Sequence, residues 1–95
     1  MTKYELCVVV SAKIEDEERT NTIEKVKALI ERFGGVITEI DDWGKRRLAY
    51  EIDKSREGYY SFIRFDAETT APAEIESRVR IMDHVIRYLI VKQEA

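Results

Sequence analysis

The hydrophobic positions of this chain switch between two spacings, one typical of strands and the other typical of helices. Residues 4–10 are almost continuously apolar and rich in β-branched side chains, the pattern of a central strand covered on both faces. Residues 15–33 place apolar side chains at every third or fourth position, as an amphipathic helix does. These spaced residues are Ile23, Val26, Ile30 and Phe33. Gly34 and Gly35 predict the end of this helix, because glycine readily adopts the left-handed conformation that closes one.

The middle of the chain predicts a long hairpin whose first strand contains a bend. That strand opens at residues 36–40, and apolar residues then alternate with others near its end, as they do where one sheet face is buried. The alternating residues are Leu48, Tyr50 and Ile52. Trp43 and Gly44 interrupt the pattern and predict a bulge. Polar residues 53–58 predict the turn, and residues 59–65 predict the third strand.

A second helix and a fourth strand complete the chain. Residues 69–72 contain two threonines and a proline, which suit a helix cap and first turn. One face of the predicted helix is apolar, formed by Ile75, Val79 and Met82. Asp83 and His84 end the pattern, and residues 85–91 predict a strand.

The order strand, helix, strand, strand, helix, strand predicts a ferredoxin-like fold in the α+β class. This fold is a four-stranded antiparallel sheet with both helices on one face. We expect residues 1–95 to form a single domain, because no linker rich in Pro, Gly or Ser divides them. Several predicted strands are apolar on both faces, although two helices cover only one. The other face is therefore expected to bind a partner.

Composition and charge limit the class of protein to which this chain can belong. The chain has 44% hydrophobic and 37% charged residues and a net charge of -3, so it is globular and its total charge is mildly acidic. A single cysteine excludes an internal disulfide and indicates a reducing compartment, and the apolar runs are too short for a membrane span. We therefore expect a cytoplasmic protein that does not bind membranes.

Positive charge is concentrated within the predicted hairpin. Lys45, Arg46 and Arg47 are consecutive, so their side chains alternate between the two faces of a strand and one neighbouring strand cannot neutralise them all. Phosphate groups of a polyanion outside the chain are the expected partner, with Trp43 and Tyr50 supporting or stacking. The alternative is a charged edge strand that prevents aggregation. Weaker candidates for RNA contact are Tyr4, Arg87 and Lys92.

No catalytic or metal-binding constellation stands out. His84 is the only histidine and is expected to cap the end of the second helix or to lie on the surface. No second histidine or nearby cysteine could complete a metal site with it. We therefore expect no enzyme activity, no cofactor, no metal site and no small-molecule substrate. Residues 58–65 resemble the third strand of RNA-recognition-motif domains but contain one extra residue, which changes the facing of the aromatic side chains. Aromatic packing within the sheet is the favoured interpretation.

The central residues resemble ribosomal protein six of the bacterial small subunit. The resemblance rests on the run Gly44-Lys45-Arg46-Arg47-Leu48-Ala49-Tyr50 and on Gly58-Tyr59-Tyr60. It extends to Tyr4-Glu5, to Phe33-Gly34-Gly35 and to residues 80–88, so it covers nearly the whole chain.

This resemblance implies a ferredoxin-like fold and a structural role in the small ribosomal subunit. Members of this family bind small-subunit ribosomal RNA together with ribosomal protein eighteen, with which they form a heterodimer. Two rivals on the same fold stay open. A small-molecule-sensing module would pair two copies through the bare sheet face without binding RNA. A phosphatase of the acylphosphatase type would need an anion-binding loop after the first strand, for which residues 11–13 are a poor match.

Overall fold

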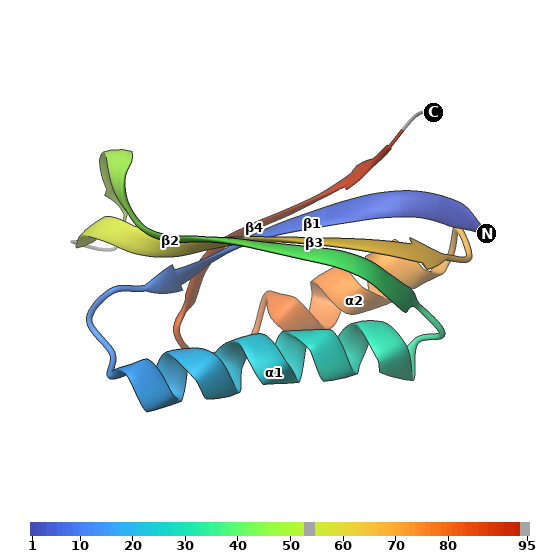
Figure 1. Ribbon diagram of the computed structural model, residues 1–95, viewed down its shortest axis with the longest axis horizontal. Helices are drawn as coiled ribbons and strands as arrows, with labels where there is room; N and C mark the ends of the chain where they lie inside the picture. Colours follow the sequence, from blue (N-terminus) through green and yellow to red (C-terminus); the bar gives the residue numbers. More distant parts are fainter. Residues whose placement is uncertain (53–54, 94–95) are drawn as a thin grey trace.

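The computed structural model describes residues 1–52 and 55–93, with side chains described for residues 1–45 and 57–93. The elements follow the predicted order of strand, helix, strand, strand, helix and strand (Figure 1). Their bounds are β1 Thr2–Ser11, α1 Asp16–Arg32, β2 Val36–Ile52, β3 Ser55–Ala67, α2 Ala71–Val79 and β4 Val85–Lys92.

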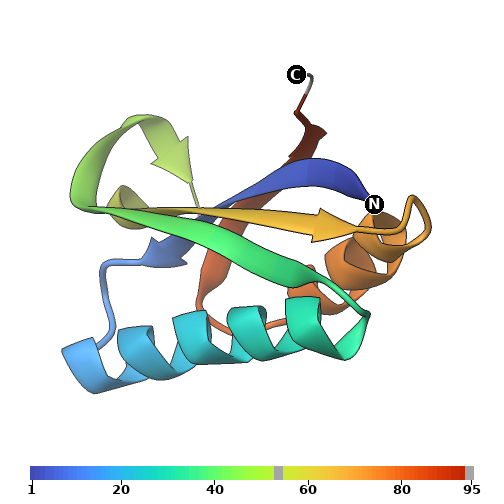
Figure 2. The same cartoon turned by 45° about the vertical axis from the view of Figure 1, so that its right-hand side comes forward.

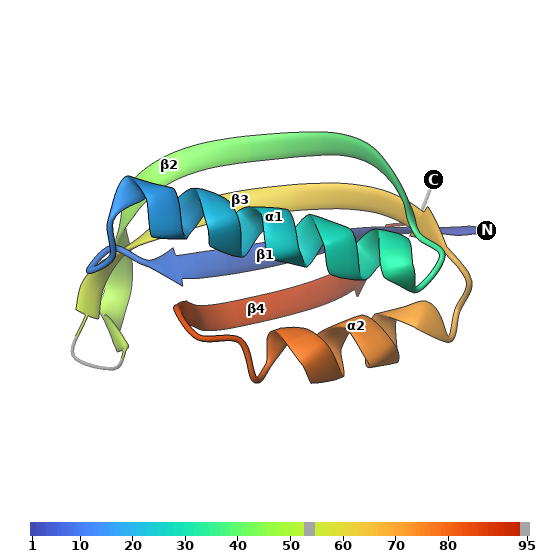
Figure 3. The same ribbon diagram turned by 90° about the horizontal axis from the view of Figure 1, so that it is seen from below.

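The strands form one antiparallel sheet in the order β2-β3-β1-β4. Both helices lie against the same face of the sheet, and α1 and α2 run side by side beneath it (Figures 1 and 3). The prediction of a ferredoxin-like fold is therefore confirmed. Because β1 lies between β3 and β4, β2 and β4 form the two edges of the sheet.

The hydrophobic core fills the space between the sheet and the helices. Alternate residues of β1 and β3 point into it and are fully buried, as the two-residue period of a strand requires. These core residues are Leu6, Val8, Val10, Ile63 and Phe65. The helices contribute Val26 and Ile30 from α1 and Ile75 and Val79 from α2. Burial of these side chains stabilises the fold. Because both helices lie on this side, no layer covers the other face of the sheet.

The predicted bulge is confirmed at Trp43 and Gly44. The pairing of β2 with β3 shifts register between Asp42 and Gly44, and Gly44 has φ +73°. Beyond this point the end of β2 curls away from the helix layer (Figures 1 and 2).

Replacing Gly44 with alanine should lower the free energy of unfolding by about 1 kcal/mol, because a left-handed backbone is unfavourable for a residue with a Cβ. The cost is conformational, since a Cβ added at Gly44 would meet no atom within 4 Å. Asparagine tolerates this conformation better, so Gly44→Asn should lose less. The midpoint of urea unfolding measures both changes. Equal losses for the two variants would contradict the conformational origin of the cost.

Two predicted boundaries were wrong. The turn was placed at residues 53–58, but β3 already begins at Ser55, so Gly58 lies inside the strand opposite Ser11. The glycine serves close packing, because a Cβ added to it would lie 2.5 Å from Cγ1 of Val9. The second helix ends at Val79 instead of continuing to Met82, whose backbone N–H donates to the Val79 carbonyl in a tighter turn.

Candidate nucleic-acid interface

The basic cluster lies on the paired part of the hairpin. Lys45 is opposite Tyr59, and the backbone positions of Arg46 and Arg47 are opposite Gly58 and Glu57. The side chains of Arg46 and Arg47, like that of Tyr50, lie outside the described residues. The Lys45 side chain is 53% exposed, and its Nζ lies 3.5 Å from Oε2 of Glu57.

An ion pair this exposed contributes little, since two solvated charges attract each other only weakly through water. Lys45 can therefore exchange its contact with Glu57 for a phosphate oxygen at small cost. The geometry around Lys45 is compatible with the predicted contact to RNA.

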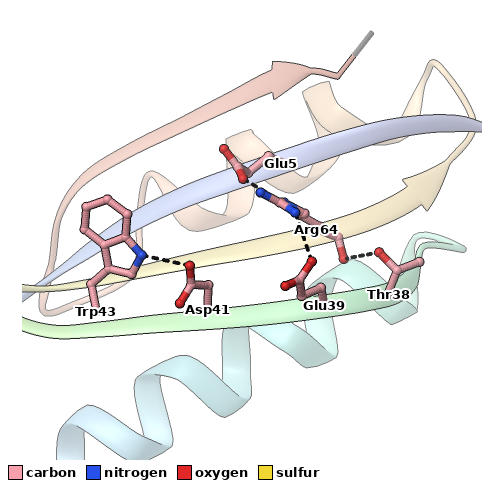
Figure 4. A network of polar contacts seen from close by, with 6 residues as sticks. All are labelled: Glu5, Thr38, Glu39, Asp41, Trp43 and Arg64. Atoms are coloured by element: carbon pink, nitrogen blue, oxygen red, sulfur yellow. Dashed lines mark hydrogen bonds and ion pairs between the residues drawn. The ribbon is translucent and has the colours of Figure 1, made fainter. Parts of the chain in front are cut away.

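Trp43 is held on the uncovered face of the sheet (Figure 4). Its indole Nε1–H donates to Oδ2 of Asp41 at 2.9 Å, and its ring packs against Phe62 with a centroid distance of 4.6 Å. The side chain keeps 49% of its surface exposed. Asp41 and Phe62 thus fix the orientation of Trp43, while about half of the residue stays accessible to solvent.

The uncovered face carries the apolar surface that the strand pattern predicted. Leu89 of β4 is 54% exposed, and its strand neighbour Cys7 is half-buried beside Phe62. Val91 adds a further exposed side chain on the same edge of the sheet. Together with Trp43 these residues form an apolar strip across all four strands, which we call the open face.

A polar network borders the open face near β2. Arg64 of β3 donates from Nε to Oε2 of Glu5 at 3.1 Å and from Nη1 to Oε2 of Glu39 at 2.9 Å (Figure 4). The hydrogen bond to Glu5 raises the pKa of Arg64, and the charge of Glu39 raises it further. Asp41, which accepts from Trp43, adds a third carboxylate on the same side of the sheet (Figure 4). With one guanidinium group among three carboxylates, this border of the open face is acidic and does not suit phosphate.

The sequence did not reveal this network, because its members come from three strands. Glu5, Glu39 and Arg64 are paired through the register of β1 and β2 with β3, in which Arg64 lies opposite both carboxylates. Alternation along the strands places Glu5 and Arg64 on the face away from the helices, but it gives Glu39 the facing of Ile37, which packs against the core. Only the register shift between Ile37 and Glu39 turns Glu39 toward Arg64.

Tyr4, a weaker candidate for RNA contact, lies in the hydrophobic core. Only 7% of the residue is exposed, and its ring stacks on Phe65 in the core with a centroid distance of 5.7 Å. Its parity in β1 is that of Leu6, so it points toward the helix layer. Tyr4 supports the core and leaves almost no surface for a base.

The two other weaker candidates for RNA contact both lie on β4. Arg87 is exposed on the open face opposite Val9, in the same row as Tyr60 and Gly44. Three strand spacings separate Arg87 from Gly44, which is about 14 Å. Lys92 is opposite Tyr4, at the end of the sheet that is remote from the hairpin. The fold therefore places Lys92 away from the basic cluster.

Cys7 is expected to react slowly with iodoacetamide. Burial raises the pKa of its thiol, and Glu5 raises it further against the opposing effect of Arg87. Because the thiolate is the reactive form, the alkylation rate of the folded protein should rise at a higher pH than the rate in urea. Mass spectrometry over a pH series measures both profiles on this single cysteine. A folded profile at or below the unfolded one would contradict this expectation.

The described part of the chain contains no cluster of three His, Cys, Asp or Glu residues able to hold a metal ion. Neither α1 nor α2 combines the length and apolar character that crossing a membrane requires.

The family model described as Ribosomal protein S6 matches residues 3–92 of this chain. The chain belongs to the ribosomal protein S6 family. The Small ribosomal subunit protein bS6 of Clostridium kluyveri is 47% identical over 94 residues, covering 99% of both chains. That of Alkaliphilus oremlandii is 42% identical over the same length, again covering 99% of both chains.

A solved member of the S6 family has the same fold. The crystal structure of 30S ribosomal protein S6 from Thermotoga maritima superposes with a TM-score of 0.93 at 32% identity, covering 97% of this chain and 87% of that one. Membership in the S6 family confirms the resemblance seen in the hairpin residues.

Proposed function

We propose that this S6-family protein is a structural component of the small ribosomal subunit in the cytoplasm. In this proposal it binds small-subunit ribosomal RNA through the hairpin of β2 and β3. It binds ribosomal protein eighteen through the open face. The observation that carries the proposal is that one sheet has both a basic hairpin and an apolar open face with an acidic border. The chain also matches the S6 family almost from end to end.

The hairpin supports the RNA-binding part of the proposal. It places three consecutive cations where β2 curls away from the helix layer, and the one whose side chain is described, Lys45, is half exposed and only weakly paired. Lysine and arginine bind phosphate through charge and hydrogen bonds without reading the base sequence. Such contacts position a protein on RNA, which is what a structural ribosomal protein needs.

The open face supports the protein-binding part of the proposal. Its apolar strip ends in Leu89 and Val91 on one side and in Trp43 on the other. The carboxylates of Glu39 and Asp41 border the strip. A partner that covers apolar surface and offers positive charge fits this combination, and a small basic ribosomal protein has that character. We therefore assign Trp43 to the protein-binding surface, although the sequence suggested stacking on bases.

Reconstitution from purified components tests this function. The protein is mixed with ribosomal protein eighteen and with small-subunit ribosomal RNA, separately and together, and the mass of each complex is measured by light scattering. We expect a one-to-one protein complex that binds the RNA more tightly than either protein does alone. A stable homodimer that binds neither component would overturn the proposal and favour the small-molecule-sensing alternative.

A further inference from the structure

A groove separates the two helices on the side of the molecule opposite the open face. It has a volume of about 450 Å³ and runs between the C-terminal half of α1 and the end of α2, which lie side by side (Figure 3). Its floor is apolar and consists of Ala28, Leu29, Ile81 and Met82. Ile81 is 74% exposed, more than any other large hydrophobic residue described in this chain. An isoleucine this exposed beside other apolar side chains marks a surface suited to a partner.

Positive charge surrounds this apolar floor. The remaining lining residues are Lys25, Arg32 and Arg78, and no carboxylate lines the groove. Within the described residues none of these three cations forms an ion pair, although the Arg32 guanidinium lies 5.9 Å from the Phe33 ring. The arrangement is unusual for a chain whose net charge is -3. It is complementary to a ligand that is both apolar and acidic.

We propose that this groove, which we call the helix groove, binds an acidic amphipathic helix of a partner protein. Apolar side chains of that helix would cover Leu29, Ile81 and Met82, and its carboxylates would meet Lys25, Arg32 and Arg78. A helix laid into an apolar groove between two others is a recurring mode of peptide recognition. This site is independent of the proposed function, because the sheet separates it from the open face.

Two other occupants fit the groove less well. The lining contains no aromatic ring on which an RNA base could stack, so RNA would gain only phosphate contacts there. A second copy of the chain docked about a two-fold axis would bring identical cations together, since such an interface uses the same patch on both subunits. Charge complementarity therefore favours the acidic helix.

Nuclear magnetic resonance titration tests the proposal on the full chain. The probe is a short amphipathic helical peptide of leucine and glutamate, and its control is the same peptide with lysine in place of glutamate. We expect the acidic peptide to shift the backbone amides of Ala28, Leu29 and Met82, with an affinity that falls as salt is added. The lysine peptide should not shift them at the same concentration.

Matched variants complete the test. Ile81→Asp should weaken binding of the acidic peptide at least about tenfold, because it places a charge on the apolar floor. Arg32→Glu should weaken it about fivefold by reversing one complementary charge. Leu89→Asp, a comparable change on the open face, should leave the affinity unchanged. Circular dichroism checks that each variant is folded.

Three results would overturn the proposal. The first is that the acidic peptide causes no localised shifts at millimolar concentration, and the second is that both peptides bind equally. The third is that the groove amides respond instead to added ribosomal RNA, or to rising protein concentration without peptide. Either response would assign the surface to another occupant.

Discussion

Replacing Lys45, Arg46 and Arg47 together with alanine should weaken binding to small-subunit ribosomal RNA about a hundredfold at physiological salt. Each phosphate contact releases counterions, so the logarithm of the binding constant falls with the logarithm of the salt concentration by a slope of roughly 1 per contact. Loss of all three cations should flatten that slope by about 2 to 3. Filter binding at several salt concentrations, with and without ribosomal protein eighteen, measures both quantities.

The matched control removes the same charge from another surface. Alanine at Lys25, Arg32 and Arg78 changes the net charge equally but acts at the helix groove. This variant should keep the RNA affinity and the salt slope of the unmodified protein. If both triple variants lose affinity equally, the hairpin makes no specific contact and only total charge matters. An unchanged slope in the hairpin variant would remove those residues from the RNA interface.

Replacing Leu89 with aspartate should weaken the complex with ribosomal protein eighteen at least about thirtyfold, a loss in the range found for the residues that dominate an interface. The new carboxylate would be buried against apolar surface without a partner. The protein itself should stay folded, because Leu89 is exposed in the isolated chain and substitutions at such sites change stability little. Isothermal titration calorimetry measures the affinity, and urea unfolding measures the stability.

Trp43→Ala provides an independent test of the same surface. It removes the aromatic side chain that packs on Phe62 and is half exposed on the open face. We expect a loss of affinity for ribosomal protein eighteen comparable to that of Leu89→Asp and little change in the RNA salt slope. The reverse result would return Trp43 to the RNA interface that its sequence neighbours suggest. Ile81→Asp is the control, since it lies on the opposite side of the molecule.

Most of the fold could be predicted because the spacing of apolar residues along the chain identifies its helices and strands. The run at residues 4–10 and the three- and four-residue spacing of Ile23, Val26 and Ile30 identify β1 and α1 without knowledge of distant contacts. The bulge at Gly44 was also visible, because a glycine inside a strand pattern often marks a bulge. Gly58 misled the prediction, because a glycine among polar residues has the signature of a turn although the structure places it in a strand.

The candidate surfaces were less predictable than the elements. The hairpin cations are recognisable as a cluster because they are adjacent in the sequence. Tyr4 was named as a weaker candidate for RNA contact, although its ring packs on Phe65. Both parities of β1 are largely apolar, so its sequence does not reveal which face the helices cover. The helix groove was not predicted at all, since it requires the relative placement of Leu29 and Ile81, which are far apart in the chain.

The sequence by itself determined the order and type of the elements, the family and the concentration of positive charge at Lys45 and the two arginines after it. The tertiary structure alone decided that Arg64 is neutralised by Glu5 and Glu39, that Trp43 lies on the open face and that three cations surround the helix groove. The physical reason is that periodicity depends on the nearest few residues. Contacts across the sheet depend on strand register and on the side to which the helices cross, which adjacent residues do not encode.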